Sequence, residues 1–163
     1  MAKKGFTLME LLLVVAVLAI VAAAAAPTFF GGAKEAMDEA RKSSFMSAYQ
    51  NTISGANLLM GIAASQGTVP TKDAVLTFTD KSNTEKKLED YAPRAARVFT
   101  NKNGKSYIFS AVYNGTDVDI VYDAGDASAE PTTLTNKIKI DATNKTVEAA
   151  LLAAWDAIKD VAN

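Results

Sequence analysis

The chain has 163 residues, with 17 Lys and Arg against 18 Asp and Glu, enough for one membrane-spanning helix and one small domain. Its net charge of -1 comes with neither a basic block nor an acidic tail, so nucleic-acid binding is not indicated. Cys and His are both absent, which excludes disulfides, Cys/His zinc sites and histidine acid–base catalysis. No P-loop or dinucleotide-binding glycine pattern occurs. We therefore expect a protein that is not an enzyme and that has no resident cofactor.

A long apolar segment lies near the N-terminus. Residues 11–26 carry no charge, and the apolar residues just before them extend the segment to the roughly 20 residues that a helix needs to cross a bilayer. Glu10 lies at the front of this segment, where a charge is expensive and is kept for a partner or a function. Lys3 and Lys4 precede it, so we expect the N-terminal end to stay in the cytoplasm and the chain after residue 27 to lie outside.

Three interpretations of this N-terminal region compete. A secretory signal peptide would be cut after the alanines at 24–26, but Glu10 lies where its apolar region should begin and Pro27 would follow the cut. A plain membrane anchor explains the length of the segment and not Glu10. The third interpretation is a very short basic leader that ends in Gly5 and is cut on the cytoplasmic side, before the apolar helix.

Residues 3–11, with the sequence KKGFTLMEL, resemble the processing site of bacterial type IV pilins and of the pseudopilins of type II secretion. The resemblance implies that a prepilin peptidase cuts between Gly5 and Phe6 and methylates the new amine of Phe6. It also places the acid of the family on Glu10 and its helix-interrupting proline on Pro27. The implied partners are identical subunits in a helical filament, the inner membrane before assembly, the prepilin peptidase and the pilus assembly machinery.

Elementary electrostatics agrees with this resemblance. Cleavage after Gly5 would create an amine on Phe6, about one helical turn before Glu10. In a filament core, Glu10 can neutralise the Phe6 amine of a neighbouring subunit, whereas a buried carboxylate without a partner costs several kcal/mol. In the unassembled protein, Glu10 can instead reach the membrane surface. Met9 stands where the family more often has Ile or Val, a mild departure, and the match covers about residues 3–30.

We expect a single long helix over about 6–63, with a weak zone at 19–32. Pro27 and the two glycines that follow at 31 and 32 disfavour a regular helix, so a helix end at 26 with a short linker is the alternative. An apolar stripe at helical spacing then continues and should seat a globular head: Phe45, Tyr49, Ile53, Ala56, Met60 and Ala63. Mixed charges ahead of it, at 34–42, are typical of a solvated helix. The expected segments are the leader 1–5, the transmembrane and filament-core helix 6–32, and the head 33–163.

The middle of the chain predicts a small antiparallel sheet. Residues 75–79 indicate a short strand or an extended loop, whereas 84–99 has helical spacing at Leu88, Tyr91, Ala95 and Phe99, with Pro93 as a break. A hairpin is predicted from 105–113 and 116–122 around the turn residues Asn114 and Gly115. Its second strand should place Val118, Ile120 and Tyr122 on the core and Asp117, Asp119 and Val121 outside. Residues 137–141 predict a third strand.

An acidic loop follows the hairpin. Asp123, Asp126 and Glu130 are candidates for holding Ca²⁺ through carboxylate oxygens, as in the C-terminal loop of some major pseudopilins. Their spacing does not match an EF-hand, and a solvated loop is the favoured interpretation. A closing helix is predicted after Thr146, its cap, with the stripe Val147, Leu151, Ala154, Trp155, Ile158 and Val161.

The predicted class is α+β: a long N-terminal hydrophobic helix that carries a small head with an antiparallel sheet of about three strands and a C-terminal helix. The favoured function is that of a type IV pilus subunit, held in the inner membrane with its head in the periplasm and then polymerised into an extracellular fibre. A pseudopilin of type II secretion and a membrane-anchored binding module are the alternatives.

Overall fold

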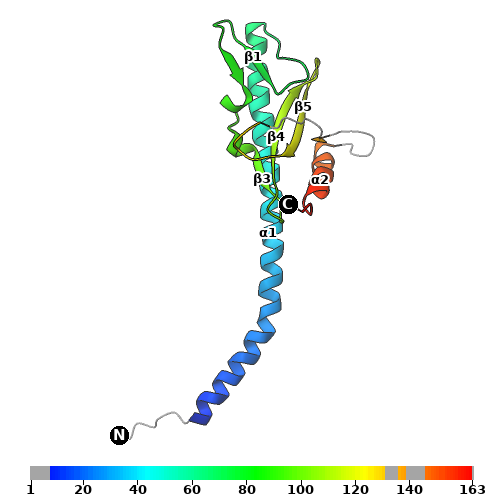
Figure 1. Ribbon diagram of the computed structural model, residues 1–163. Helices are drawn as coiled ribbons and strands as arrows, with labels where there is room; N and C mark the ends of the chain where they lie inside the picture. Colours follow the sequence, from blue (N-terminus) through cyan, green and yellow to red (C-terminus); the bar gives the residue numbers. More distant parts are fainter. Residues whose placement is uncertain (1–7, 131–135, 139–145, 163) are drawn as a thin grey trace, which may run out of the picture. The chain divides into compact units, whose positions relative to one another are not determined.

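The computed structural model describes residues 8–130, 136–138 and 146–162 (Figure 1). Within residues 8–31 the description is one of the backbone, Val14 excepted. The chain divides into two compact units, Met1–Glu39 and Ala40–Asn163.

The first element is α1, Leu8–Gln66, a helix of 59 residues. Its backbone is helical through Pro27 and the two glycines that follow, so the expected single long helix is confirmed and the alternative, a helix end at 26 with a short linker, is wrong. A proline removes one hydrogen bond of a helix, a loss that a long helix tolerates locally. The helix ends at Gln66, and Gly67 follows with a φ of 66°, which suits glycine. Thr68 completes the helix end, because its N–H and its hydroxyl both donate hydrogen bonds to Ala63 O.

The head contains two antiparallel sheets. The smaller pairs β1 (Thr77–Thr79) with β2 (Glu85–Lys87), and the larger has the strand order β3 (Val98–Thr100), β4 (Ser106–Tyr113), β5 (Val118–Ala124), β6 (Asn136–Lys137). Two short 3-10 turns, η1 (Leu88–Asp90) and η2 (Arg94–Arg97), connect the sheets, and α2 (Val147–Ile158) follows. The predicted α+β class is therefore confirmed, with four strands in the main sheet instead of about three.

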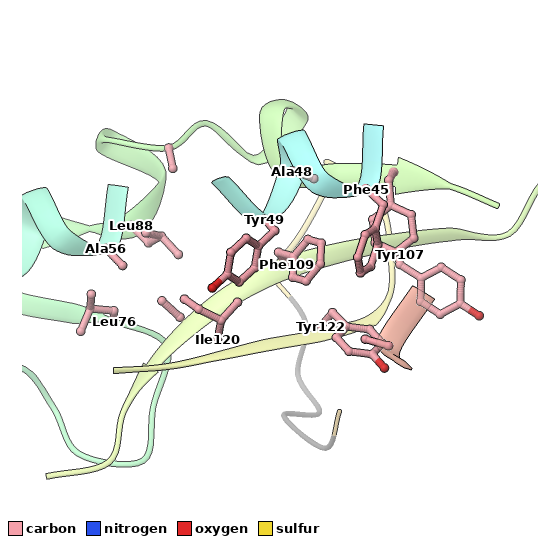
Figure 2. Close-up of a cluster of buried hydrophobic side chains, with 14 of the residues drawn as sticks. Phe45, Ala48, Tyr49, Ala56, Leu76, Leu88, Tyr107, Phe109, Ile120 and Tyr122 are labelled. Carbon is pink, nitrogen blue, oxygen red and sulfur yellow. The ribbon is translucent and has the colours of Figure 1, made fainter. Parts of the chain in front are cut away.

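The core lies between one face of the main sheet and α1 (Figure 2). Phe45 on α1 meets Phe99 at 4.9 Å and Phe109 at 5.2 Å between ring centroids, and Trp155 of α2 approaches the same ring to 5.6 Å. The predicted stripe is confirmed, with Ile53 and Met60 only partly buried. Buried residues of α1 that the stripe left out are Ala48, Thr52, Gly55 and Leu59.

The helix predicted over 84–99 is wrong. This stretch forms β2, the two 3-10 turns and β3 instead. Asp90 accepts a hydrogen bond from Lys87 N at 2.8 Å, and Pro93 precedes η2, so the chain turns twice where a helix would continue straight. Of the four residues with helical spacing, Leu88 and Phe99 are buried, but from a turn and a strand, whereas Tyr91 is half-buried and Ala95 is exposed.

The hairpin of β4 and β5 is confirmed, with a longer loop than predicted. Tyr113 pairs with Val118, and Asn114 Oδ1 accepts hydrogen bonds from Thr116 N at 3.0 Å and Asp117 N at 2.9 Å. The loop is therefore not a two-residue turn. Val121 was expected to face solvent and is buried, because the second face of the sheet is also covered.

The remaining predictions concern the C-terminal part. The strand predicted over 137–141 is present as the short β6, and residues 139–141 lie outside the described part. Thr146 caps α2, as predicted, by accepting from Ala149 N at 3.2 Å. The buried face of α2 comprises Ala150, Leu151, Ala154, Trp155 and Ile158. The two ends of the predicted stripe, Val147 and Val161, are exposed instead.

Candidate processing and assembly site

The predicted processing bond lies outside the described residues. Gly5 and Phe6 precede α1, which begins at Leu8. Glu10 and Pro27 lie on α1, where the backbone is described. Glu10 falls in the first turn, and a carboxylate there is favoured by the positive end of the helix dipole. Cleavage between Gly5 and Phe6, and the pairing of Glu10 with a neighbour's Phe6 amine, stay predictions.

Among the residues whose side chains the structure describes, which leave out most of 8–31, no helix is long and apolar enough to span a bilayer. Val14, the described side chain of the N-terminal turns of α1, is exposed.

A charged segment of α1 follows. Residues 34–42 mix both signs and are exposed or half-exposed, as predicted for a solvated helix. Met37, within it, is exposed as well. Beyond Lys42 the charges stop, and no Asp, Glu, Lys or Arg occurs again until Lys72. The exposed positions of α1 after Lys42 are therefore all uncharged, and Leu58 among them is 53% exposed.

The three Ca²⁺ candidates are not brought together. Asp123 Oδ1 accepts from Ala124 N and Asp126 Oδ1 from Ser128 N, each at 2.8 Å. The hydrogen bonds from Ser128 lower the pKa of Asp126. Among the described residues, no group of three or more acidic side chains is placed to hold a metal ion.

Glu130 has a different role from either interpretation of the acidic loop. It forms an ion pair with Arg97 and accepts from Ser110 Oγ at 2.5 Å, with its own side chain 26% exposed. The solvated-loop interpretation is therefore wrong for Glu130. Sequence reasoning missed Arg97 because nothing in the local pattern distinguishes it from the neighbouring Arg94.

A cavity of about 400 Å³ lies in the head between the β1–β2 hairpin, η1 and residues 128–130. Val75 and Leu88 supply apolar lining, while Arg94 at the wall binds Glu89 at 2.5 Å and donates to Ser128 O at 2.6 Å. Because these charges neutralise one another, the cavity does not define the chemistry of a ligand.

The C-terminal end of α2 is held by the β3–β4 turn. Asn101 Nδ2 donates to Ile158 O and Val161 O at 2.8 Å each, and Asn103 Nδ2 donates to Asp160 O at 2.9 Å. These amides satisfy carbonyl groups that a helix end leaves without partners. Lys102 beside them lowers the pKa of Asp160 through a hydrogen bond.

Comparison with protein-family models matches residues 1–26 to the prokaryotic N-terminal methylation motif. Neither the comparison with curated proteins nor that with solved structures finds a match. The N-terminal segment is thus a class III prepilin leader with the start of its helix, which confirms the resemblance to type IV pilins and pseudopilins. A leader of this kind implies processing by a prepilin peptidase and anchoring in the membrane before assembly. Proteins with this leader are generally structural.

Proposed function

We propose that this protein is the structural subunit of a type IV pilus, which polymerises through its N-terminal helix into a surface fibre for adhesion, motility or DNA uptake. The observation that carries the proposal is the methylation motif at residues 1–26, of which residues 8–26 form the start of the 59-residue helix α1. The C-terminal half of the same helix is the central element of the core of the head. One continuous element therefore links the processed end to the head.

Assembly in this proposal begins with the cut between Gly5 and Phe6. The new amine of Phe6 pairs with Glu10 of a neighbouring subunit, and this pairing sets the register between identical helices. Because the same contact repeats head-to-tail without closing into a ring, the product is an open helical filament. Residues 6–26 lie at the axis of the filament and the heads lie outside.

The surface chemistry of α1 in the head supports contacts between copies. Its exposed positions from Ser43 to Ser65 lack charges, in contrast to the charged residues at 34–42. Centres of protein interfaces are depleted in charged residues, and small residues allow helices to approach closely. A neighbouring subunit of the same chain, with the same uncharged helix face, fits this surface.

A pseudopilin of type II secretion is the second candidate, because the methylation motif is common to both kinds of subunit. Such a subunit would build a short periplasmic fibre instead of a surface pilus. Neighbouring genes separate the two: assembly and retraction ATPases favour the pilus, and an outer-membrane secretion channel favours the pseudopilus.

The direct test is electron microscopy of material sheared from intact cells, with mass-spectrometric identification of the fibre protein. The proposal predicts long fibres composed of this chain. Fibres that contain no trace of it, while the protein stays in the membrane fraction, would refute the pilus and favour the second candidate. A density map of the fibre with residues 6–26 on its outside would refute the proposed packing.

A further inference from the structure

The main sheet has a second face, turned away from α1. On β4, Ile108, Ser110 and Val112 alternate with the core residues, and all three are buried, as is Val121 on β5. The apolar members of this set do not belong to the cluster that packs on α1. A separate cover must therefore lie on this outer face.

Residues 125–130, which we call the strap, supply part of this cover. Gly125 N donates to Ser106 O at 3.1 Å, at the start of β4. A Cβ placed on Gly125 would lie 3.2 Å from Ile108 Cγ2, so the strap backbone lies in close contact with the outer face. The strap therefore follows the outer side of β4.

Arg97 holds the far end of the strap. Its side chain is 0% exposed, and all three of its nitrogens donate hydrogen bonds. Nε donates to Ala92 O at 2.8 Å and Nη1 to Phe109 O at 2.6 Å, while Nη1 and Nη2 bind the two carboxylate oxygens of Glu130. Glu130 also accepts from Ser110 Oγ at 2.5 Å. One buried guanidinium thus joins η2, the centre of β4 and the strap.

Apolar burial contributes little to holding the strap. Residues 126–129 are small or polar, and all are exposed. Among the described residues, two further hydrogen bonds attach this end of the strap: Ser110 Oγ donates to the same carboxylate of Glu130, and Arg94 Nη1 donates to Ser128 O at an exposed position. A hydrogen bond between ionised groups is stronger than one between neutral groups, and more so in a buried site. The ion pair is therefore the main attachment of the strap at this end.

We propose that Arg97 and Glu130 form a lock that keeps the strap closed over the outer face of the sheet, in a chain that has no cysteine with which to cross-link it. The lock acts on the position of the strap more than on the stability of the head. Replacing a buried ion pair by apolar groups is often neutral for stability, whereas removing one partner leaves an unpaired charge. The proposal does not depend on the function of the fibre.

Hydrogen exchange of the full-length protein in detergent tests the lock, with mass-spectrometric readout of a peptide that covers the strap. Glu130→Gln should accelerate exchange in the strap by about tenfold or more, because a charge-assisted bond is lost. The matched control is Asp126→Asn, which changes an exposed carboxylate in the same strap and keeps an acceptor for Ser128 N. Its exchange should match the wild type.

A second variant covers the case in which Glu130→Gln does not fold. Arg97→Met combined with Glu130→Ala removes both charges, so the head should melt within a few degrees of the wild type, while exchange in the strap is again accelerated about tenfold or more. Strap exchange equal to the wild type in a folded variant would overturn the proposal. So would an acceleration spread evenly over the sheet and α1, or failure of the double variant to fold, since either would make the pair a general stabiliser of the head.

Discussion

Gly55 of α1 lies directly against Ala92, in the turn between η1 and η2. A Cβ built on Gly55 would come within 2.5 Å of Ala92 Cβ and 3.2 Å of Ala92 N, so no larger residue fits without a shift of the backbone. A glycine in the middle of a helix costs about 0.5–1 kcal/mol relative to alanine. At Gly55 this cost is offset by packing, because the missing side chain lets α1 lie close to Ala92 in the segment that leads to Arg97.

The first prediction uses this contact. Gly55→Ala should destabilise the head by about 1–3 kcal/mol, because overpacking a filled site forces neighbouring atoms apart. The matched control is Gly61→Ala on the same helix, where a Cβ meets nothing within 4 Å. It should stabilise the helix by about 0.5–1 kcal/mol. Thermal unfolding of both full-length variants in detergent measures the difference, and equal effects of the two substitutions would contradict the contact.

The second prediction concerns assembly. Glu10→Ala should still insert into the membrane, because removing a carboxylate makes insertion easier, but it should yield much less surface fibre, because the Phe6 amine loses its partner. The amount of sheared fibre relative to membrane-bound subunit is the measurement. Glu35→Ala, which removes an exposed carboxylate further along α1, is the control and should assemble normally. Wild-type fibre levels from Glu10→Ala would contradict the pairing.

The third prediction concerns calcium. A chelator should leave the melting temperature unchanged, because Asp123 and Asp126 accept from nearby backbone N–H groups and Glu130 is engaged by Arg97. Magnesium and calcium added in turn should have no effect either. A rise in melting temperature with calcium alone would show that the acidic loop binds the ion after all.

The fourth prediction is the behaviour at alkaline pH. Burial raises the pKa of Tyr49, Tyr107 and Tyr122 from the ordinary value of 10.0, with a further contribution from Asp123 for the last two. A group whose pKa is raised in the folded state contributes stability that is complete below the unfolded pKa and is lost as the pH rises through the folded one. The melting temperature should therefore fall above about pH 10, as the phenolate absorbance of these tyrosines rises. A stability that stays flat up to pH 12 would contradict this burial.

Local patterns predicted the parts of the fold that are locally determined. The stripe from Phe45 to Ala63 has helical spacing over several turns, and the β4–β5 hairpin has strand-forming residues on both sides of Asn114. Thr52 escaped this pattern because it is polar, and its hydroxyl is satisfied by Ala48 O at 2.7 Å within the helix. Spacing also misled at 84–99, where Leu88 and Phe99 happen to lie at helical intervals but pack from a turn and a strand.

Contacts between distant segments were not predictable in this way. Val121 alternates with core residues and was assigned to solvent, because the sequence does not show that the strap and its neighbours cover the second face of the sheet. Arg97 and Glu130 lie 33 residues apart, and neither stands in a pattern that points to the other. The N-terminal segment, in contrast, was predictable from its local sequence. The order of Gly5, Phe6 and Glu10 indicated the leader that the family comparison confirms.

The position at which the mature chain begins distinguishes a prepilin from the two other kinds of N-terminal segment. Intact-mass and N-terminal peptide analysis of the protein from sheared fibres should give a chain that starts at Phe6 with one methyl group on its amine and that lacks residues 1–5. A mature chain that starts at Pro27 would identify an ordinary signal peptide, and one that retains residues 1–5 would identify a plain anchor. Either result would contradict processing as a prepilin.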